Sequence, residues 1–370
     1  MIHYDGRNKD YVIGKEWVHR KKCYETAHFT MRRHMSVLAQ AKPRDGKSVI
    51  SKDLCVKISH DRKVLIFDHN LEWARSVTKY NYKAESPDRL TGVKVLDRFT
   101  FPVTDFLSAA DFASFGFAGR NAGSLARVLK KTKWFHRGDP DKITQIVDDI
   151  PIRRAQERRF RTKYQADIVA DNAERVKTIR NAWRALREFF WQGEKDTRPI
   201  INFEEEFLKH DHLIVNFNYE PETVEAFVAR TFFAKVLQKM WSVCCQVKPV
   251  IFIEEARNLI PDEKGTITYP SNSIMYSYVM DGPKEGIGVY VICQNENQIY
   301  DRLLEGIQER IIGRVNNPPS GDIFRVKLFR GRRSRKKDEF LYERQESSDN
   351  QVAYTKFVPC VPCMAFRSEK

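Results

Sequence analysis

The sequence predicts an α/β fold built on a parallel sheet, and three observations lead to this prediction. Short continuous apolar runs recur along the chain, as is typical of strands that are buried on both faces. Amphipathic helical patterns lie between them, of which 222–243 is the longest. Several of the apolar runs end in polar or charged residues, namely Asp68, Glu254 with Glu255, and Gln294. Because parallel strands end at one edge of a sheet, these residues are expected to meet there.

The apolar run 35–39 leads into a loop that has the pattern of a phosphate-binding turn. Residues 41–48 (Ala-Lys-Pro-Arg-Asp-Gly-Lys-Ser) match G-x-x-x-x-G-K-[ST] except for Ala41 at the first glycine position. A helical pattern follows, so backbone N–H groups of the loop and of the helix N-terminus would face an anion. Lys47 would neutralise the β- and γ-phosphates, and Ser48 would offer its hydroxyl to Mg²⁺.

The nucleotide-binding set expected from this loop is Ala41, Pro43, Arg44, Asp45, Gly46, Lys47, Ser48 and Val49. Ala41 fits such a turn only if its φ is negative, because alanine lacks the access of glycine to positive φ. An ordinary basic strand–turn–helix without a ligand is the alternative.

The acidic pair Glu254–Glu255 is the second strong signal. The first acid could hold Mg²⁺, usually through water, and the second could orient or deprotonate an attacking water. A kinase for a small metabolite does not need the second acid, so the pair favours hydrolysis. Asp68 joins Ser48 and Glu254 as a metal candidate, and Gln294 could sense the γ-phosphate. The alternative for the two acids is a charged helix start, where carboxylates are favourable.

Composition indicates a globular protein with a polyanionic partner. The chain has 370 residues, of which 42% are hydrophobic, enough for a large core plus an insertion. A net charge of +15 and a pI of about 9.4 favour nucleic acid over a membrane as partner. No apolar run approaches the roughly 18 residues of a membrane-spanning helix. The N-terminus has no signal-peptide pattern. A cytoplasmic location is therefore expected.

Seven cysteines, an odd number, lie mostly in apolar surroundings, which fits a reducing compartment. Cys360 and Cys363 form a lone C-x-x-C pair. Buried thiols are the favoured interpretation of this pair, with zinc or redox chemistry as the alternative.

Changes of character along the chain predict five segments. They are a short N-terminal extension (1–34), the first part of the core (35–102), a helical basic insertion (103–199), the second part of the core (200–329) and a basic C-terminal tail (330–370). The insertion is rich in basic residues that few acids balance: Arg153, Arg154, Arg158, Arg159, Arg161, Lys163, Arg175, Lys177, Arg180, Arg184 and Arg187. Contact with DNA and a solvated helix face both remain open as explanations.

The order and spacing of these pieces resemble the HerA/FtsK branch of P-loop ATPases, the DNA pumps. The segment 252–259 looks like the Asp-Glu-Ala-His segment of that family, with Glu254 in the aspartate slot. Residues 281–288, followed by a strand ending in glutamine, resemble its Gly-Arg-Lys-x-Gly-Ile stretch, and 299–315 resembles the helix and arginine-bearing strand after it. The departures are Ala41, Glu254 for aspartate, and Pro283 where the family has arginine. The compact, basic form is similar to ATPases of archaea and their viruses or plasmids, including genome-packaging ones.

This resemblance implies a RecA-like P-loop NTPase fold of the ASCE type, with the helical insertion between the second and third core strands. It implies ATP- and Mg²⁺-dependent translocation or packaging of double-stranded DNA by a homo-oligomeric, hexameric ring without a membrane span. A nuclease or a capsid is an expected further partner, and the resemblance implies a location in a host cytoplasm or in association with a virion. Since Pro283 carries no charge, the cation given to a neighbouring subunit would be Lys284 or Arg314, with Arg33 as a third candidate.

Two other functions remain open at this stage. One is a P-loop ATPase that remodels RNA or a partner protein. The other, from a different class, is a basic DNA-binding or virion protein whose ATP site is vestigial.

Overall fold

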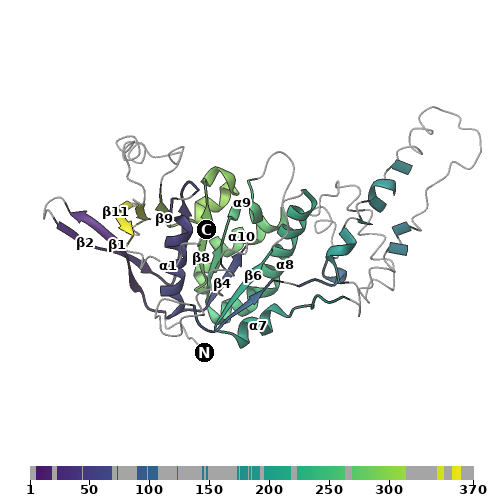
Figure 1. Cartoon of the computed structure of the whole chain (residues 1–370), viewed down its shortest axis with the longest axis horizontal. Helices are drawn as coiled ribbons and strands as arrows, with labels where there is room; N and C mark the ends of the chain where they lie inside the picture. The colour runs from purple at the N-terminus through teal and green to yellow at the C-terminus, as the bar shows by residue number, and fades with distance from the viewer. Residues whose placement is uncertain are drawn as a thin grey trace, which may run out of the picture.

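A computed structural model describes most of the predicted core. The described residues are 6–18, 23–43, 45–68, 73, 90–97, 99–106, 123, 144–145, 147–148, 173–174, 176–181, 183–184, 186–191, 196–217, 223–262, 269–313, 340–345 and 352–359. In these parts of the chain the strands form one sheet of eleven, in the order β2-β1-β11-β10-β9-β3-β8-β7-β4-β6-β5 (Figure 1).

Seven neighbouring strands of this sheet run parallel. They are β3 (Ser36–Gln40), β4 (Val64–Asp68), β5 (Val93–Leu96), β6 (His212–Asn216), β7 (Val250–Ile253), β8 (Gly288–Cys293) and β9 (Glu309–Ile312). The other four strands add to β9 in antiparallel pairs. These are β1 (Lys9–Val18), β2 (Cys23–Met31), β10 (Phe340–Gln345) and β11 (Val352–Pro359). The predicted α/β class with a parallel core is confirmed.

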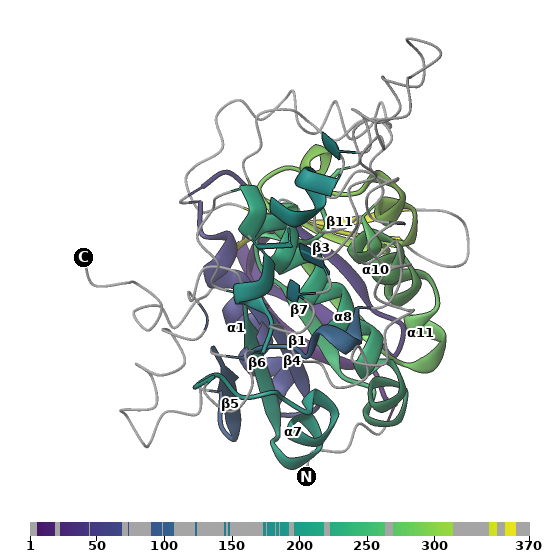
Figure 2. The same cartoon turned by 90° about the vertical axis from the view of Figure 1, so that its right-hand side faces the viewer.

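Helices cover both faces of the parallel part (Figures 1 and 2). They are α1 (Lys47–Ser59), α7 (Phe203–Lys209), α8 (Thr223–Val247), α9 (Ala256–Leu259), α10 (Pro270–Met280) and α11 (Gly282–Glu285). Short 3₁₀ turns accompany them: η1 (Val103–Asp105), η3 (Arg187–Phe189), η5 (Glu296–Gln298) and η6 (Asp301–Gly306). No helix of the described residues is long and apolar enough to cross a membrane.

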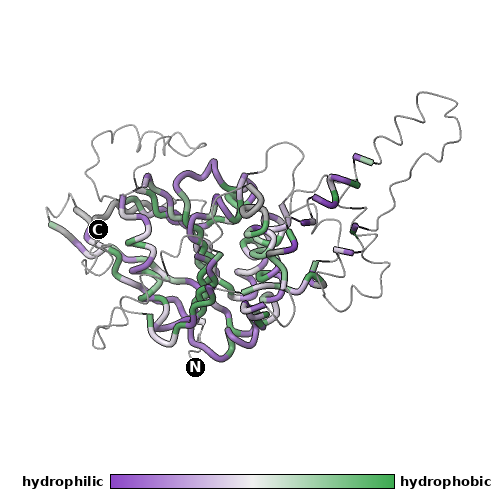
Figure 3. Tube along the Cα trace, turned by 45° about the vertical axis from the view of Figure 1, so that its right-hand side comes forward, coloured by the Kyte–Doolittle hydropathy of each residue, from purple (hydrophilic) through white to green (hydrophobic). Residues whose placement is uncertain are grey.

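The alternation of side chains along β4 shows why the core has two layers. Val64 and Ile66 belong to the apolar cluster that includes α1, whereas Leu65 and Phe67 belong to the cluster under α8. Phe67 meets Phe233 of α8 edge to face, with ring centroids 4.8 Å apart. Both faces of such strands are covered, so their sequences are continuous apolar runs. Figure 3 shows the central strands as a mostly hydrophobic band with hydrophilic residues on the outer parts.

Two strands lie where we expected only a basic tail. Residues 340–345 and 352–359 form β10 and β11, and β11 pairs with β1 of the N-terminal extension. The N-terminal strands β1 and β2 and the C-terminal strands β10 and β11 thus form the antiparallel part of the sheet together. The basic run 330–337 lies outside the described residues.

The helical insertion leaves and rejoins the core at one place. Thr100 bridges to Ile200, and Phe101 bridges to Phe190, in parallel pairing. The backbone N–H of Thr100 donates to the carbonyl of Pro199 at 3.1 Å. Because β5 precedes this segment, the insertion follows the third strand of the parallel part along the chain, where we had expected the second.

A buried arginine ties the strand ends at the amino-terminal edge of the parallel sheet. Arg62, between α1 and β4, is fully buried. Its guanidinium donates to the carbonyls of Lys248 at 2.9 Å, Pro249 at 3.0 Å and Gly286. A buried charge is tolerated only when its hydrogen bonds are satisfied, so this arrangement fixes the starts of β7 and β8 relative to α1.

We expect stability to depend on His212, at the start of β6. Its Nδ1 accepts a hydrogen bond from the backbone N–H of Val64 at 3.1 Å, and burial lowers its pKa from 6.5 to about 4. The unfolded chain binds this proton more tightly, so acid favours unfolding. This contribution is complete above pH 6.5 and is lost as the pH falls to about 4, about 3 kcal/mol in all. Urea unfolding measured across this range should show the loss. The His212→Asn variant, which retains an acceptor, should have a flatter pH dependence.

Candidate functional site

The phosphate loop connects β3 to α1, as the sequence predicts. Gly46 has φ +83° and ψ +7°, a left-handed conformation that favours glycine. It places Lys47 as the first helical residue, and the backbone N–H of Ile50 donates to the carbonyl of Gly46 at 3.0 Å. Asp45 is buried, whereas Pro43 is exposed. Ser48 and Val49 occupy the first turn of α1, and Arg44 lies outside the described residues.

Ala41, the departure from the motif, is accommodated by its surroundings. Its φ is not positive, which meets the condition set by the sequence. Its methyl group is fully buried beside Gly313, which follows β9. A Cβ atom at Gly313 would lie only 2.7 Å from Cβ of Ala41. The Ala41 methyl group, which a glycine at this motif position would lack, therefore occupies space that Gly313 leaves open after the neighbouring strand β9.

Lys47 and the two acids lie at the same edge of the sheet. The Nζ atom of Lys47 is 3.6 Å from Oε1 of Glu255, and only 7% of the lysine side chain is exposed. The same Oε1 accepts a hydrogen bond from Nε2 of Gln294 at 3.4 Å. β8, which Gln294 follows, lies between β3, which leads into the loop, and β7, which the two acids follow. The structure thus brings together the expected loop lysine, acid and glutamine.

Ser48 and Glu254 form the other half of this site. The Ser48 hydroxyl donates to Oε1 of Glu254 at 3.2 Å, and Glu254 is 1% exposed. Both offer hard oxygen ligands of the kind Mg²⁺ prefers. The described residues contain no group of three or more His, Cys, Asp or Glu side chains that could hold a metal alone.

Glu255 has an unusual backbone. Its φ of +45° and ψ of +52° are left-handed, a conformation uncommon for a residue other than glycine. The turn stops β7 at Ile253 and starts α9 at Ala256, so the carboxylate is aimed back toward Lys47. Its Oε2 is buried without a hydrogen-bond partner, although Nε of Arg257 lies 3.6 Å away. Strain of this kind persists where the surrounding structure fixes it, and it concentrates at functional sites.

Asp68, the third metal candidate, holds a residue that sequence reasoning missed. Its Oδ2 accepts a hydrogen bond from the backbone N–H of Trp73 at 2.9 Å. The indole Nε1–H of Trp73 donates to Oε2 of Glu254 at 3.0 Å. No motif marks a tryptophan five residues after a strand, so the only available signal was the strand-terminal aspartate itself.

None of the three candidates for the cross-subunit cation is seen at the phosphate-loop edge: Lys284 and Arg33 lie at the opposite edge of the sheet, and Arg314 lies outside the described residues. Lys284 is in α11, before β8, and its side chain is 74% exposed and paired with Asp281 at 2.9 Å. It therefore lies at the amino-terminal edge, about 20 Å along β8 from the phosphate loop. Arg33 is also exposed at that edge, just before β3. Arg314 lies outside the described residues.

Part of the basic insertion makes contacts within the chain. Arg184 pairs with Asp148 at 3.0 Å, and Arg180 donates to the carbonyls of Val147 and Asp148. These two arginines have partners inside the insertion. Residues 153–163 and Arg175 lie outside the described residues, so their role in DNA binding stays a prediction.

The described cysteines are free thiols, and most are buried. Burial raises the pKa of Cys293, next to Gln294, to about 12, and it also raises the pKa of Cys55 and Cys244. Neutral, buried thiols of this kind are chemically inert. Cys360 and Cys363 lie outside the described residues.

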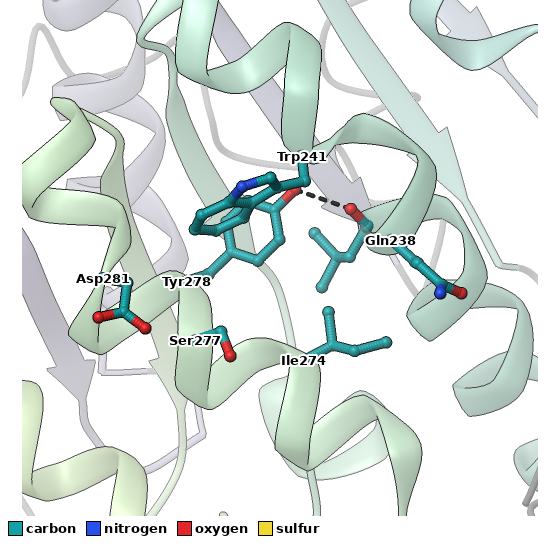
Figure 4. A pocket seen from close by; sticks show the side chains of 7 residues that line it. Gln238, Trp241, Ile274, Ser277, Tyr278 and Asp281 are labelled. Atoms are coloured by element: carbon teal, nitrogen blue, oxygen red, sulfur yellow. Dashed lines mark hydrogen bonds between the residues drawn. The ribbon is translucent and has the colours of Figure 1, made fainter.

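A groove of about 420 Å³ lies apart from these residues, between α8 and α10 (Figure 4). Trp241 and Tyr278 meet edge to face in it, with ring centroids 4.8 Å apart. Leu237 and Ile274 add apolar surface, and Asp281 closes one end. None of the strand-end residues lines the groove, so it is distinct from the phosphate-loop site.

No protein-family model and no curated protein sequence matches this chain. Solved structures do match. VirB4 of Thermoanaerobacter pseudethanolicus superposes with a TM-score of 0.56 at 14% identity, covering 96% of this chain and 98% of that one. The plasmid coupling protein TrwB, in complex with the ATP analogue ADPNP, has a TM-score of 0.50 at 11% identity, with 88% and 78% covered. A weaker likeness, with a TM-score of 0.42, is to the genome-packaging NTPase B204 of Sulfolobus turreted icosahedral virus 2, at 10% identity with 89% and 100% covered. The chain therefore shares the overall fold of VirB4 and TrwB, in agreement with the α/β, RecA-like fold that the sequence predicts.

We expect Ala41 and Gly313 to be energetically coupled. The Gly313→Ala variant should lower the free energy of unfolding by about 1–3 kcal/mol, because its methyl group would overlap that of Ala41 and press on the Phe340 ring. The Ala41→Gly, Gly313→Ala double variant should recover part of the loss. Urea unfolding of the single and double variants measures this coupling. Strictly additive losses would show that the two residues are not in contact.

Proposed function

We propose that this protein hydrolyses ATP to move double-stranded DNA, as a ring of subunits. One observation carries the proposal. Three parallel strands, β3, β7 and β8, lead to Lys47 with Ser48, to Glu254 with Glu255, and to Gln294, and these residues meet at the carboxyl edge of the sheet through contacts of 3.2–3.6 Å. This edge is where ligands bind in open parallel sheets.

Each residue has a distinct task in this proposal. The loop N–H groups and Lys47 bind the phosphates, and the lysine leaves its ion pair with Glu255 to do so. Glu255, once released, accepts a proton from the attacking water. Gln294 hydrogen-bonds the γ-phosphate or that water. Ser48 and Glu254 hold Mg²⁺, which supplies charge neutralisation for the phosphates when it is bound.

Support for a DNA partner comes from charge and from the family resemblance. The net charge of +15 favours a polyanion. The accommodation of Ala41, and the contacts of Lys47 and Ser48 with Glu255 and Glu254, favour a working ATP site over a vestigial one. Action on RNA or on a protein remains the competing proposal, and a comparison of ATP turnover with duplex DNA, RNA and neither separates them.

The first prediction separates binding from chemistry. The Glu255→Gln variant should bind ATP at least as tightly as the wild type, because Lys47 no longer has to leave an ion pair. It should hydrolyse ATP at least about a hundredfold more slowly, because the base is lost.

The Lys47→Ala variant should fold but lose ATP binding. Calorimetric binding and single-turnover hydrolysis measure both effects. Normal turnover in Lys47→Ala would exclude the proposed ATPase site.

The second prediction concerns the basic insertion. If Arg158 and Arg159 contact phosphates, reversing both charges should weaken duplex binding and reduce the slope of log affinity against log salt by about 2. DNA-stimulated turnover should fall while basal turnover stays. The control reverses Lys15 and Lys94, which are exposed outside the insertion and change the net charge equally. Equal effects of the two double variants would mean that only net charge matters.

The third prediction concerns the ring. Lys284 lies before the start of β8, at the opposite edge of the sheet from the phosphate loop, so it is too far away to reach the site of its own subunit. Any catalytic role of Lys284 must therefore be across a subunit interface. Lys284→Ala should then preserve ATP binding and ring assembly but abolish turnover. Mixing it with Lys47→Ala subunits should restore part of the activity, because some interfaces join an intact Lys47 to an intact Lys284. If neither Lys284, Arg33 nor Arg314 variants recover on mixing, the site is completed within one chain.

A further inference from the structure

We propose that Trp73 is a positioning residue for the metal-binding carboxylate of Glu254, and that Asp68 acts by holding Trp73 and not by binding Mg²⁺. This inference rests on the proposed ATPase function. It assigns a role to a side chain outside the recognised motifs, and it changes the role expected for Asp68.

The contacts form one continuous chain across two strand ends. β4 and β7 are neighbours, and the backbone N–H of Glu254 donates to the carbonyl of Phe67 at 3.0 Å. Asp68 follows Phe67 and accepts from the backbone N–H of Trp73 at 2.9 Å. The indole of Trp73 then reaches back to Oε2 of Glu254 at 3.0 Å. The aspartate and the glutamate are therefore linked through the tryptophan.

The indole ring is itself held in place. Trp73 is 2% exposed, and its ring packs against Phe252 with centroids 5.7 Å apart. The Nζ atom of Lys52 lies 5.8 Å from its ring centroid, within range of a cation–π interaction. A large, buried side chain packed between Phe252 and Lys52, with its backbone N–H held by Asp68, has little freedom. Its N–H is therefore a donor with a set direction.

The hydrogen bond from Trp73 fixes the orientation of the Glu254 carboxylate. With Oε2 bound by the indole, Oε1 is the oxygen that faces Ser48, at 3.2 Å. Ser48 and Oε1 are the oxygens that would share Mg²⁺. Donors to the far oxygen of a ligating carboxylate orient it, and their loss typically weakens metal affinity or activity 10–100-fold.

The use of Asp68 follows from the same geometry. Its Oδ2 faces the backbone N–H of Trp73, a contact that an uncharged oxygen can also make. Asp68→Asn should therefore be mild if the residue only holds Trp73. If it binds Mg²⁺ directly, loss of the charge should be as severe as loss of Glu254.

The experiment measures metal binding directly. The probe is Mn²⁺, titrated into the 370-residue chain saturated with ADP and followed by electron paramagnetic resonance. Trp73→Phe, which removes the N–H but keeps a ring, should weaken Mn²⁺ binding about tenfold. ADP binding in EDTA should be unchanged. The matched control is Trp183→Phe, because Trp183 is equally buried and donates its indole N–H to Thr144 at 2.9 Å in the insertion.

A second replacement guards against a packing defect in Trp73→Phe. Benzothienylalanine at position 73 keeps the shape of the indole and lacks only the N–H, so it should give the same loss. Wild-type Mn²⁺ affinity with this replacement would overturn the role of Trp73. Loss of Mn²⁺ binding in Asp68→Asn that equals the loss in Glu254→Gln would overturn the role of Asp68. Failure of the wild type to bind ADP would instead overturn the proposed function.

Discussion

The ion pair between Lys47 and Glu255 is the contact on which the site depends. A lysine and two carboxylates lie at a largely buried sheet edge, where any one of these charges alone would be costly. Their proximity offsets much of that cost. It also pairs Lys47 with Glu255 at 3.6 Å. In the proposed function, a bound phosphate would replace Glu255 beside Lys47 and so free the acid.

Backbone geometry supports this arrangement from both sides. Gly46 turns the chain into α1 with a left-handed conformation that costs a glycine little, whereas Glu255 adopts a similar conformation at the end of β7 with a side chain attached. The turn at Gly46 positions Lys47, and the turn at Glu255 positions the carboxylate of that residue. Arg62 fixes the opposite ends of the same strands through carbonyl contacts, so the site is built on an anchored sheet.

The parallel strands could be predicted from sequence because burial on both faces leaves continuous apolar runs, as in β4 and β7. Strands β2, β10 and β11 could not be predicted from sequence in this way. Their residues alternate or mix with charges, as in Phe-Leu-Tyr-Glu-Arg-Gln of β10, and their pairing joins the two ends of the chain. In the site, the motif residues Lys47, Ser48 and Glu255 were predictable because their spacing is local. Trp73 and Gly313 were not, since their roles arise from contacts with residues far away in sequence.

Phe340, in β10, packs its ring against the phosphate loop and so connects the loop to the antiparallel strands. Its ring lies 3.8 Å from the point where a Cβ of Gly46 would sit, and it also contacts the space beside Gly313. β10 continues through β11 and β1 to the outer strand β2. Under the proposed function, a phosphate loop that shifted with its ligand would press on the Phe340 ring, and through β10 on the hydrogen-bonded strands β11, β1 and β2.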